Sequence, residues 1–168
     1  MTDKNAVKFE LNSPFKTKNQ KVLPEWIDYN GHMNVAYYTL AFDKSLDFFF
    51  EDILGIGPTY VSKVSKGPFA LKASYHYFSE LLVSEDFYVD LSVVDFDLKR
   101  VHICGEMKKV PSGELSAVFE TVLMNVDLKN RKAIEYSQNV LGIFENLKNS
   151  LKIDSLPNVI GKTISLRR

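Results

Sequence analysis

The chain has 168 residues, of which 45% are hydrophobic and 25% are charged, a size and composition typical of one compact domain. Lys plus Arg total 21 and Asp plus Glu also total 21, so no net charge favours nucleic acid or an anionic membrane as a partner. No apolar run approaches the ~20 residues of a membrane helix, and the N-terminal region lacks the apolar stretch of a signal peptide. We therefore expect a cytoplasmic protein that binds neither nucleic acid nor membrane.

The first half of the chain is dominated by one predicted helix. Residues 1–13 show no period and are expected to be mobile or to form an edge, and 15–27 reads as a strand that ends or bends near Pro24. Over 35–54, apolar residues recur at spacings of three and four, which predicts a long amphipathic helix. Gly55, Gly57 and Pro58 mark its end.

The period then changes from about four residues to two, which predicts strands. The alternating segments are 69–77, 87–93, 101–107 and 115–123, and a helical spacing returns over 140–151. Short connections at 97–99 and 111–113 predict that consecutive strands are antiparallel neighbours. Residues 152–168 show no clear pattern. The lone Cys104 falls inside one of these strands, where burial as a small hydrophobe is expected.

These elements predict an α+β fold in which a curved sheet of about five strands covers the long helix. One domain is expected over residues 1–168, with its core at about 15–150. An open sheet of this size has exposed edges, so pairing of two copies edge to edge predicts a homodimer, and the pairing of dimers into tetramers stays open.

The segment 28–34, Asp-Tyr-Asn-Gly-His-Met-Asn, directly precedes the long helix. Polar groups that accept or donate protons gather there, beside the unpaired N–H groups that a helix start presents. We place the chemistry here. The same residue types also gather at turns and helix starts for capping alone, and that reading stays open for Asp28 and Asn30.

At this point the sequence resembles the hotdog-fold acyl-CoA thioesterases, the four-hydroxybenzoyl-CoA thioesterase-like group, over about 22–147. Asp28-x-x-Gly31 stands where that group carries its essential aspartate, and Asp28-x-Asn30-x-His32 is similar to the grouping in plant acyl-carrier-protein thioesterases. The run 24–33, with Asp97-x-Lys99-Arg100-x-His102, looks like the thioesterase domain often fused to L-carnitine dehydrogenase. That resemblance implies a hotdog fold and hydrolysis of betainyl-CoA or another short acyl-CoA, although these residues include no dehydrogenase domain.

The resemblance implies roles for the polar segment. Asp28 could attack the thioester carbonyl or take a proton from an attacking water, and Asn30 could orient that water. His32 could exchange protons or hold Asp28 in place. Backbone N–H groups of 31–34 are expected to form an oxyanion hole, which makes Gly31, Met33 and Asn34 substrate-binding residues.

Further candidates lie outside the segment. Glu80 occupies a position where the carnitine-linked domains also tend to have Glu, and it is a candidate catalytic carboxylate or a solvated strand end. Tyr37 and Tyr38 are expected to line the acyl site or to pack in the core. Lys99 and Arg100 could meet the phosphates of CoA. Three scattered histidines give no metal signature, and no cofactor is expected.

Two other functions stay open. A hydratase of the same fold would add water to an enoyl thioester, but its motif, which resembles Asp-x-Asn-Pro-x-His, has a longer spacing and a Pro where this chain has Gly31. A non-catalytic dimeric acyl-CoA-binding module would bind without releasing a thiol.

Overall fold

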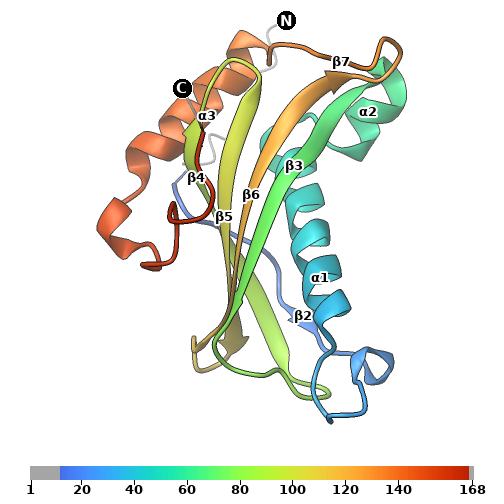
Figure 1. Cartoon of the computed structure of the whole chain (residues 1–168), viewed down its shortest axis with the longest axis vertical. Coiled ribbons are helices and arrows are strands. Elements are labelled where there is room, and N and C mark those ends of the chain that lie inside the picture. The colour runs from blue at the N-terminus through green and yellow to red at the C-terminus, as the bar shows by residue number, and fades with distance from the viewer. Residues whose placement is uncertain (1–11, 167–168) are drawn as a thin grey trace, which may run out of the picture.

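The structure is a computed structural model that describes residues 12–166. An antiparallel sheet in the order β1-β4-β5-β6-β3 curves around the helix α1, and β2 and β7 pair with β4 and β6 (Figure 1). The strands are β1 (Phe15–Lys16), β2 (Gln20–Lys21), β3 (Lys66–Tyr77), β4 (Asp86–Phe96), β5 (Arg100–Val110), β6 (Leu115–Asp127) and β7 (Lys132–Ala133). The helices are η1 (Pro24–Trp26), α1 (Val35–Phe48), η2 (Phe49–Ile53), α2 (Pro58–Val64), α3 (Gln138–Ser150) and η3 (Ile153–Ser155). The predicted α+β class is confirmed.

The long helix begins where the Asn34 side chain accepts a hydrogen bond from the Ala36 N–H, which satisfies one of the unpaired donors of the first turn. It continues without a break through the wider turn of η2, so the prediction for 35–54 is confirmed. Its buried face carries Phe42, which packs against Gly105 of β5; a Cβ there would lie 3.2 Å from the ring. A bare backbone at this position lets α1 lie close to the sheet.

The expectation for the segment before the helix needs correction. The predicted strand 15–27 pairs with β4 only through the two short strands β1 and β2, because Pro24 starts the 3-10 helix η1 instead of ending a strand. The predicted end of the long helix is confirmed, because the helix stops at Ile53, before Gly55. Pro58 opens α2, at a position where its fixed φ suits a helix and no N–H is needed.

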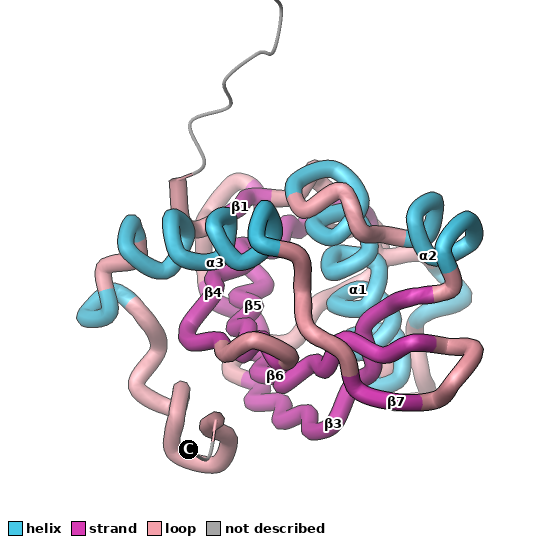
Figure 2. The backbone as a smooth tube through the Cα atoms, turned by 90° about the horizontal axis from the view of Figure 1, so that it is seen from above, coloured by secondary structure: helices cyan, strands magenta, loops and turns pink. Residues whose placement is uncertain are grey.

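The inner face of the sheet and both long helices share one hydrophobic core. Apolar side chains of β4, β5 and β6 alternate toward α1, as the period of two predicted. Helix α3 lies against β4 (Figure 2). Phe144 of α3 packs against Phe96 of β4 with ring centroids 5.6 Å apart. The predicted helix 140–151 is thereby confirmed as part of this core.

Strand β3 lies at an edge of the sheet. β4, β5 and β6 are antiparallel neighbours in sequence order, as predicted, but β3 pairs with β6 and not with β4. The connection from β3 to β4, residues 78–85, is long enough to cross the sheet. Within residues 12–166 the other edge of β3 is unpaired, and it carries the exposed side chains of Phe69, Leu71 and Tyr77.

The C-terminal segment, which the sequence left unassigned, lies on the outer face of the sheet. Its Gly161 N–H donates to Glu120 Oε1 at 2.7 Å, and its Ile164 and Leu166 pack with Val122. Beneath it, Glu120 and His102 form a buried pair in which Oε1 and Nε2 are 2.7 Å apart. The C-terminal segment therefore covers part of the face opposite α1.

Cys104 is buried, as predicted, and burial raises the pKa of its thiol. In the described part of the chain, no helix is long and apolar enough to cross a membrane. The expectation for residues 1–13 falls almost entirely outside the described residues.

Candidate active site

The polar segment folds into a tight turn at the mouth of α1. Gly31 N–H donates to the Asp28 carbonyl at 3.0 Å, and Asp28 N–H donates to the His32 carbonyl at 3.0 Å. Gly31 has a φ of 82°, a left-handed conformation that glycine adopts without strain. This turn places Asp28 beside the first turn of α1.

The Asp28 carboxylate is half-buried and faces the helix start. Its Oδ1 accepts the Asn30 N–H at 2.8 Å, and its Oδ2 lies 3.3 Å from Asn34 Nδ2. The helix cap is Asn34 and not Asp28, whose carboxylate instead accepts an N–H within the turn. The Asn30 side chain is exposed, and its contact with Asp28 is made by its backbone.

The His32 ring is half-buried, with Nδ1 3.1 Å from the Met33 carbonyl oxygen. A carbonyl oxygen only accepts, so this contact places the ring proton on Nδ1 and leaves Nε2 able to accept a proton. The ring forms no hydrogen bond to Asp28 within the described chain; His32 contacts that residue through its backbone carbonyl.

A cleft of about 350 Å³ opens between the start of α1 and the end of β3. It is lined by His32, Met33, Val35, Tyr38, Tyr77, Phe78, Ser79 and Glu80. Burial raises the pKa of the Tyr38 hydroxyl, whose oxygen accepts the Leu81 N–H at 3.1 Å. The structure thus gathers four predicted site residues that are up to 48 positions apart in the sequence, His32 and Glu80 being the outermost.

The sequence missed the contribution of β3 and of Val35 to this cleft. Tyr77 packs edge-on against Tyr38 with ring centroids 5.2 Å apart, and Phe78 is half exposed just beyond it. Apolar residues left exposed at the end of a strand were the available signal. Tyr37, in contrast, stacks on Trp26 at 5.4 Å and does not line the cleft.

The expected set of oxyanion donors needs correction. The N–H groups of Gly31, Met33 and Asn34 already donate to the carbonyls of Asp28, Leu81 and Trp26. The Ala36 N–H is taken by the Asn34 side chain. In this region, the N–H groups of His32 and Val35 have no acceptor among residues 12–166, and Val35 lines the cleft.

Lys99 and Arg100 lie elsewhere. They line a separate surface pocket with Leu71, and the distance along β3 from Leu71 to Tyr77 is roughly 20 Å at ~3.3 Å per residue. The Arg100 guanidinium binds Asp97 Oδ2 through two nitrogens, at 2.8 and 2.6 Å. Within one chain, Lys99 and Arg100 therefore do not reach the cleft between α1 and β3.

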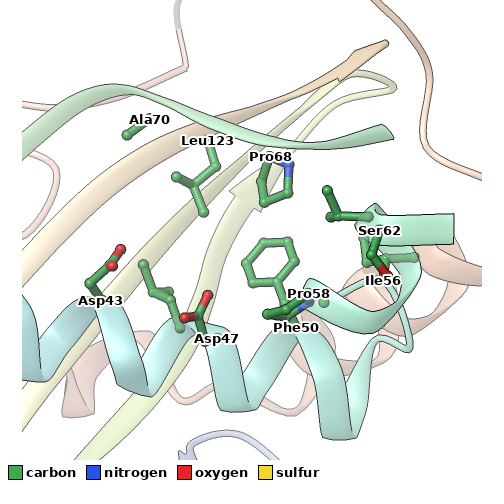
Figure 3. A pocket seen from close by; sticks show the side chains of 12 residues that line it. Asp43, Asp47, Phe50, Ile56, Pro58, Ser62, Pro68, Ala70 and Leu123 are labelled. Atoms are coloured by element: carbon green, nitrogen blue, oxygen red, sulfur yellow. The ribbon is translucent and has the colours of Figure 1, made fainter. Parts of the chain in front are cut away.

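A second pocket, of about 480 Å³, lies farther along α1, between the helix, α2 and β3. Asp43 and Asp47 of α1 and Phe50 of η2 point into it from the helix side, opposite Pro68 and Ala70 of β3 (Figure 3). Burial and the charge of Asp43 raise the pKa of Asp47. Nothing in the sequence singles out these two residues, and both are exposed, as charged residues on a helix usually are. No grouping of His, Cys, Asp and Glu suited to a metal occurs in the described part of the chain.

Comparison with known proteins identifies relatives over most of the chain. The family model of the thioesterase-like superfamily matches residues 22–160. A betainyl-CoA thioesterase of Pseudomonas aeruginosa is 28% identical over 150 residues, which cover 89% of this chain and 94% of that protein. An L-carnitine dehydrogenase/betainyl-CoA thioesterase of Rhizobium meliloti is 23% identical over 160 residues, or 95% of this chain and 32% of that longer protein.

Solved structures share the fold. The protein SAV2348 of Staphylococcus aureus, described in complex with CoA, superposes with a TM-score of 0.81 at 24% identity, over 93% of this chain and 97% of that one. A 1,4-dihydroxy-2-naphthoyl-CoA thioesterase of Synechocystis gives a TM-score of 0.71 at 15% identity, over 80% of this chain and 98% of that one.

Proposed function

The chain belongs to the thioesterase-like superfamily and is an acyl-CoA thioester hydrolase, and from this premise we propose that its substrate is a short acyl-CoA, with betainyl-CoA as the first candidate. A relative that is similar over 94% of its own length is a betainyl-CoA thioesterase, which supports this choice. The reaction adds water to the thioester carbonyl, breaks the C–S bond, and releases a carboxylic acid and the thiol of CoA.

The observation that carries the site is the presence of three groups within eight residues at the start of α1: a half-buried carboxylate, an imidazole nitrogen that can accept a proton, and a backbone N–H without an acceptor. These belong to Asp28, His32 and Val35. The imidazole and the N–H line the cleft, and the carboxylate lies in the adjoining turn. A thioester needs an activated oxygen nucleophile and donors for the developing oxyanion, and this arrangement offers both.

Asp28 is the proposed nucleophile or general base. In one route its oxygen attacks the carbonyl carbon, CoA leaves as a thiolate, and water then hydrolyses the mixed anhydride. In the other, Asp28 takes a proton from a water that attacks directly. The Asn30 N–H and the Asn34 side chain hold the carboxylate in place for either route.

The remaining roles follow from position. His32 Nε2 moves a proton between water and the departing sulfur, and the Val35 N–H, at the positive end of the helix dipole, binds the oxyanion. Gly31 lets the substrate approach the turn, and Met33 and Tyr38 form the floor of the cleft. Glu80, exposed at the rim, is a second candidate carboxylate.

The unpaired edge of β3 supports a homodimer. A strand of 12 residues with exposed apolar side chains is open to pairing with the same strand of a second copy about a two-fold axis. The C-terminal segment covers part of the outer face of the sheet, which disfavours the stacking of two dimers face to face into a tetramer. The lone buried Cys104 fits a cytoplasmic location, where thiols stay reduced.

Lys99 is the better candidate for contact with CoA phosphates. It is exposed and forms no ion pair in the described structure, whereas Arg100 is held by Asp97. The pocket that contains Lys99 includes Leu71, near the middle of β3, so the proposed dimer would bring it close to the second copy.

The test is a thiol-release screen with betainyl-, acetyl-, hexanoyl- and benzoyl-CoA. A colorimetric thiol reagent gives little background, because burial raises the pKa of the Cys104 thiol. We expect the highest kcat/KM with a short acyl group. A preference for long chains would refute the substrate proposal, and hydration of crotonyl-CoA without thiol release would instead support a hydratase.

A further inference from the structure

The wall of the cleft that faces the start of α1 is largely a loop. Strand β3 ends at Tyr77, and the wall continues through Phe78, Ser79 and Glu80 before the chain enters the core at Leu81. Loop segments are more mobile than strands unless hydrogen bonds and buried side chains hold them. The wall keeps its place because both of its ends are held.

The first end is held by Ser116 of β6. The N–H groups of Phe78 and Ser79 both donate to the Ser116 carbonyl, at 2.8 and 3.1 Å. The Ser116 hydroxyl donates to the Ser79 carbonyl at 2.7 Å, and this serine is fully buried. Three hydrogen bonds to one residue thus fix the point where the wall leaves β3.

The second end is held by Tyr38 of α1. Its hydroxyl oxygen accepts the Leu81 N–H at 3.1 Å, and the Leu81 carbonyl accepts the Met33 N–H at 2.8 Å. Leu81 is 0% exposed, so water does not replace either bond. Both polar backbone groups of Leu81 therefore depend on residues at the mouth of α1.

The two ends are joined through their hydroxyl groups. Burial raises the pKa of Tyr38, and a hydrogen bond with the Ser116 side chain acts against that rise. The Tyr38 hydroxyl accepts from Leu81 and still has its own proton to donate, whereas the Ser116 proton already goes to the Ser79 carbonyl. Ser116 Oγ is then the acceptor for Tyr38, and the two hydroxyls form one buried clamp.

The position of this wall decides how much room the cleft has. The opposite side carries His32 and Val35 and is fixed by the turn and the helix. At about 350 Å³, the cleft lies near the lower limit for ligand pockets, so a small shift of the wall changes which acyl groups fit.

We propose that Tyr38 and Ser116 are positioning residues whose hydroxyl groups fix residues 78–81 and thereby limit the length of the acyl group. This rests on the proposed function and deepens it, because it assigns the preference for a short acyl group to two side chains that need not touch the thioester.

The test compares hexanoyl-CoA with acetyl-CoA in Tyr38→Phe and Ser116→Ala. Without the Tyr38 oxygen the buried Leu81 N–H has no acceptor, so the wall moves outward until water reaches that group. The ratio of kcat/KM for hexanoyl-CoA to kcat/KM for acetyl-CoA should rise about fivefold in each variant, the factor that one hydrogen bond contributes. A ratio within about twofold of wild type in both variants would overturn the proposal.

The double variant tests whether the two hydroxyls act together. Because they hold the same segment, the ratio in Tyr38→Phe with Ser116→Ala should be close to that of the single variants. A ratio equal to the product of the two single effects would overturn the joint clamp.

Two controls separate this role from a general loss of stability. Tyr136→Phe makes the same change at an equally buried tyrosine, whose hydroxyl has no hydrogen-bond partner within residues 12–166. Glu120→Ala removes a buried side chain on the outer face of the sheet, away from the cleft. Tyr136→Phe should change neither the Tm nor the ratio, and Glu120→Ala should lower the Tm alone. A rise of the ratio in either control would overturn the assignment to the clamp.

Hydrogen exchange separates this inference from the proposed function, because it needs no turnover. The Leu81 amide should exchange at least about fivefold faster in Tyr38→Phe than in wild type, and at the wild-type rate in Tyr136→Phe. Unchanged exchange of Leu81 would overturn the clamp whether or not the enzyme is active. Absence of thiol release from every acyl-CoA would instead refute the catalytic roles.

Discussion

Replacing Asp28 with Asn separates catalysis from support of the turn, because the two roles differ greatly in size. The amide keeps an oxygen for the Asn30 N–H, but its NH₂ group then faces Asn34 Nδ2, so one hydrogen bond is lost. That loss costs about 1 kcal/mol of unfolding free energy. A domain stabilised by roughly 5–15 kcal/mol stays folded after such a loss, and its Tm falls by about 2–4 °C.

A catalytic carboxylate predicts a much larger effect on turnover. Removing a general base or nucleophile should lower kcat about 10²- to 10⁴-fold, or roughly 3–5 kcal/mol at 1.36 kcal/mol per decade. The assay is thiol release under saturating acyl-CoA, beside a thermal melt of the same preparation. Glu25→Gln, the same chemical change at an exposed residue of η1, should leave both measurements unchanged. If Asp28→Asn retains kcat within about threefold of wild type, the carboxylate serves the turn alone and the catalytic scheme is refuted.

Three further predictions concern the fold. Glu120→Ala should lower the unfolding free energy by about 1–3 kcal/mol in urea titrations, because it leaves the buried His102 Nε2 without its hydrogen-bond partner, and full stability in this variant would contradict a structural pair. Gly105→Ala should lower the unfolding free energy by about 1–3 kcal/mol in the same assay, because the new Cβ would lie 3.2 Å from the side chains of Leu91 and Phe42. Gly142→Ala should raise it by about 0.5–1 kcal/mol, because the new Cβ meets nothing within 4 Å and alanine favours the helix α3. Burial alone would raise the pKa of Asp97, but hydrogen bonds from neighbouring N–H and guanidinium groups lower it overall. The ionised carboxylate therefore stabilises the fold above pH ~4, and this effect is lost as pH falls through the lower folded-state pKa. The Tm difference between wild type and Asp97→Asn should be larger at pH 6 than at pH 3.

The elements themselves were open to prediction because their signals are local. The apolar stripe of 35–54 and the alternation in β4, β5 and β6 are properties of neighbouring residues, and both survive in the structure. The end of the long helix before Gly55 and Pro58 was also predicted, but the short helix α2 that Pro58 opens was not, because its seven residues carry no clear apolar period.

The candidate site was only partly open to prediction. Asp28 and His32 stand together in the sequence, so their grouping at the helix mouth needed only the turn and the cap. The backbone donors did not follow from sequence, because two of the three acceptors that occupy them, the carbonyls of Leu81 and Trp26, come from residues that the fold brings close.

What the amino-acid order determines by itself is the set of elements and the polar turn before α1, since hydrogen bonding and apolar periodicity act over a few residues. The tertiary structure alone decides that β3 joins β6 at an edge, that Glu80 meets His32 in one cleft, and that Asp43 and Asp47 face an apolar pocket. Those contacts join distant parts of the chain, and their geometry is set by how the sheet curves around the helix, which no local pattern encodes.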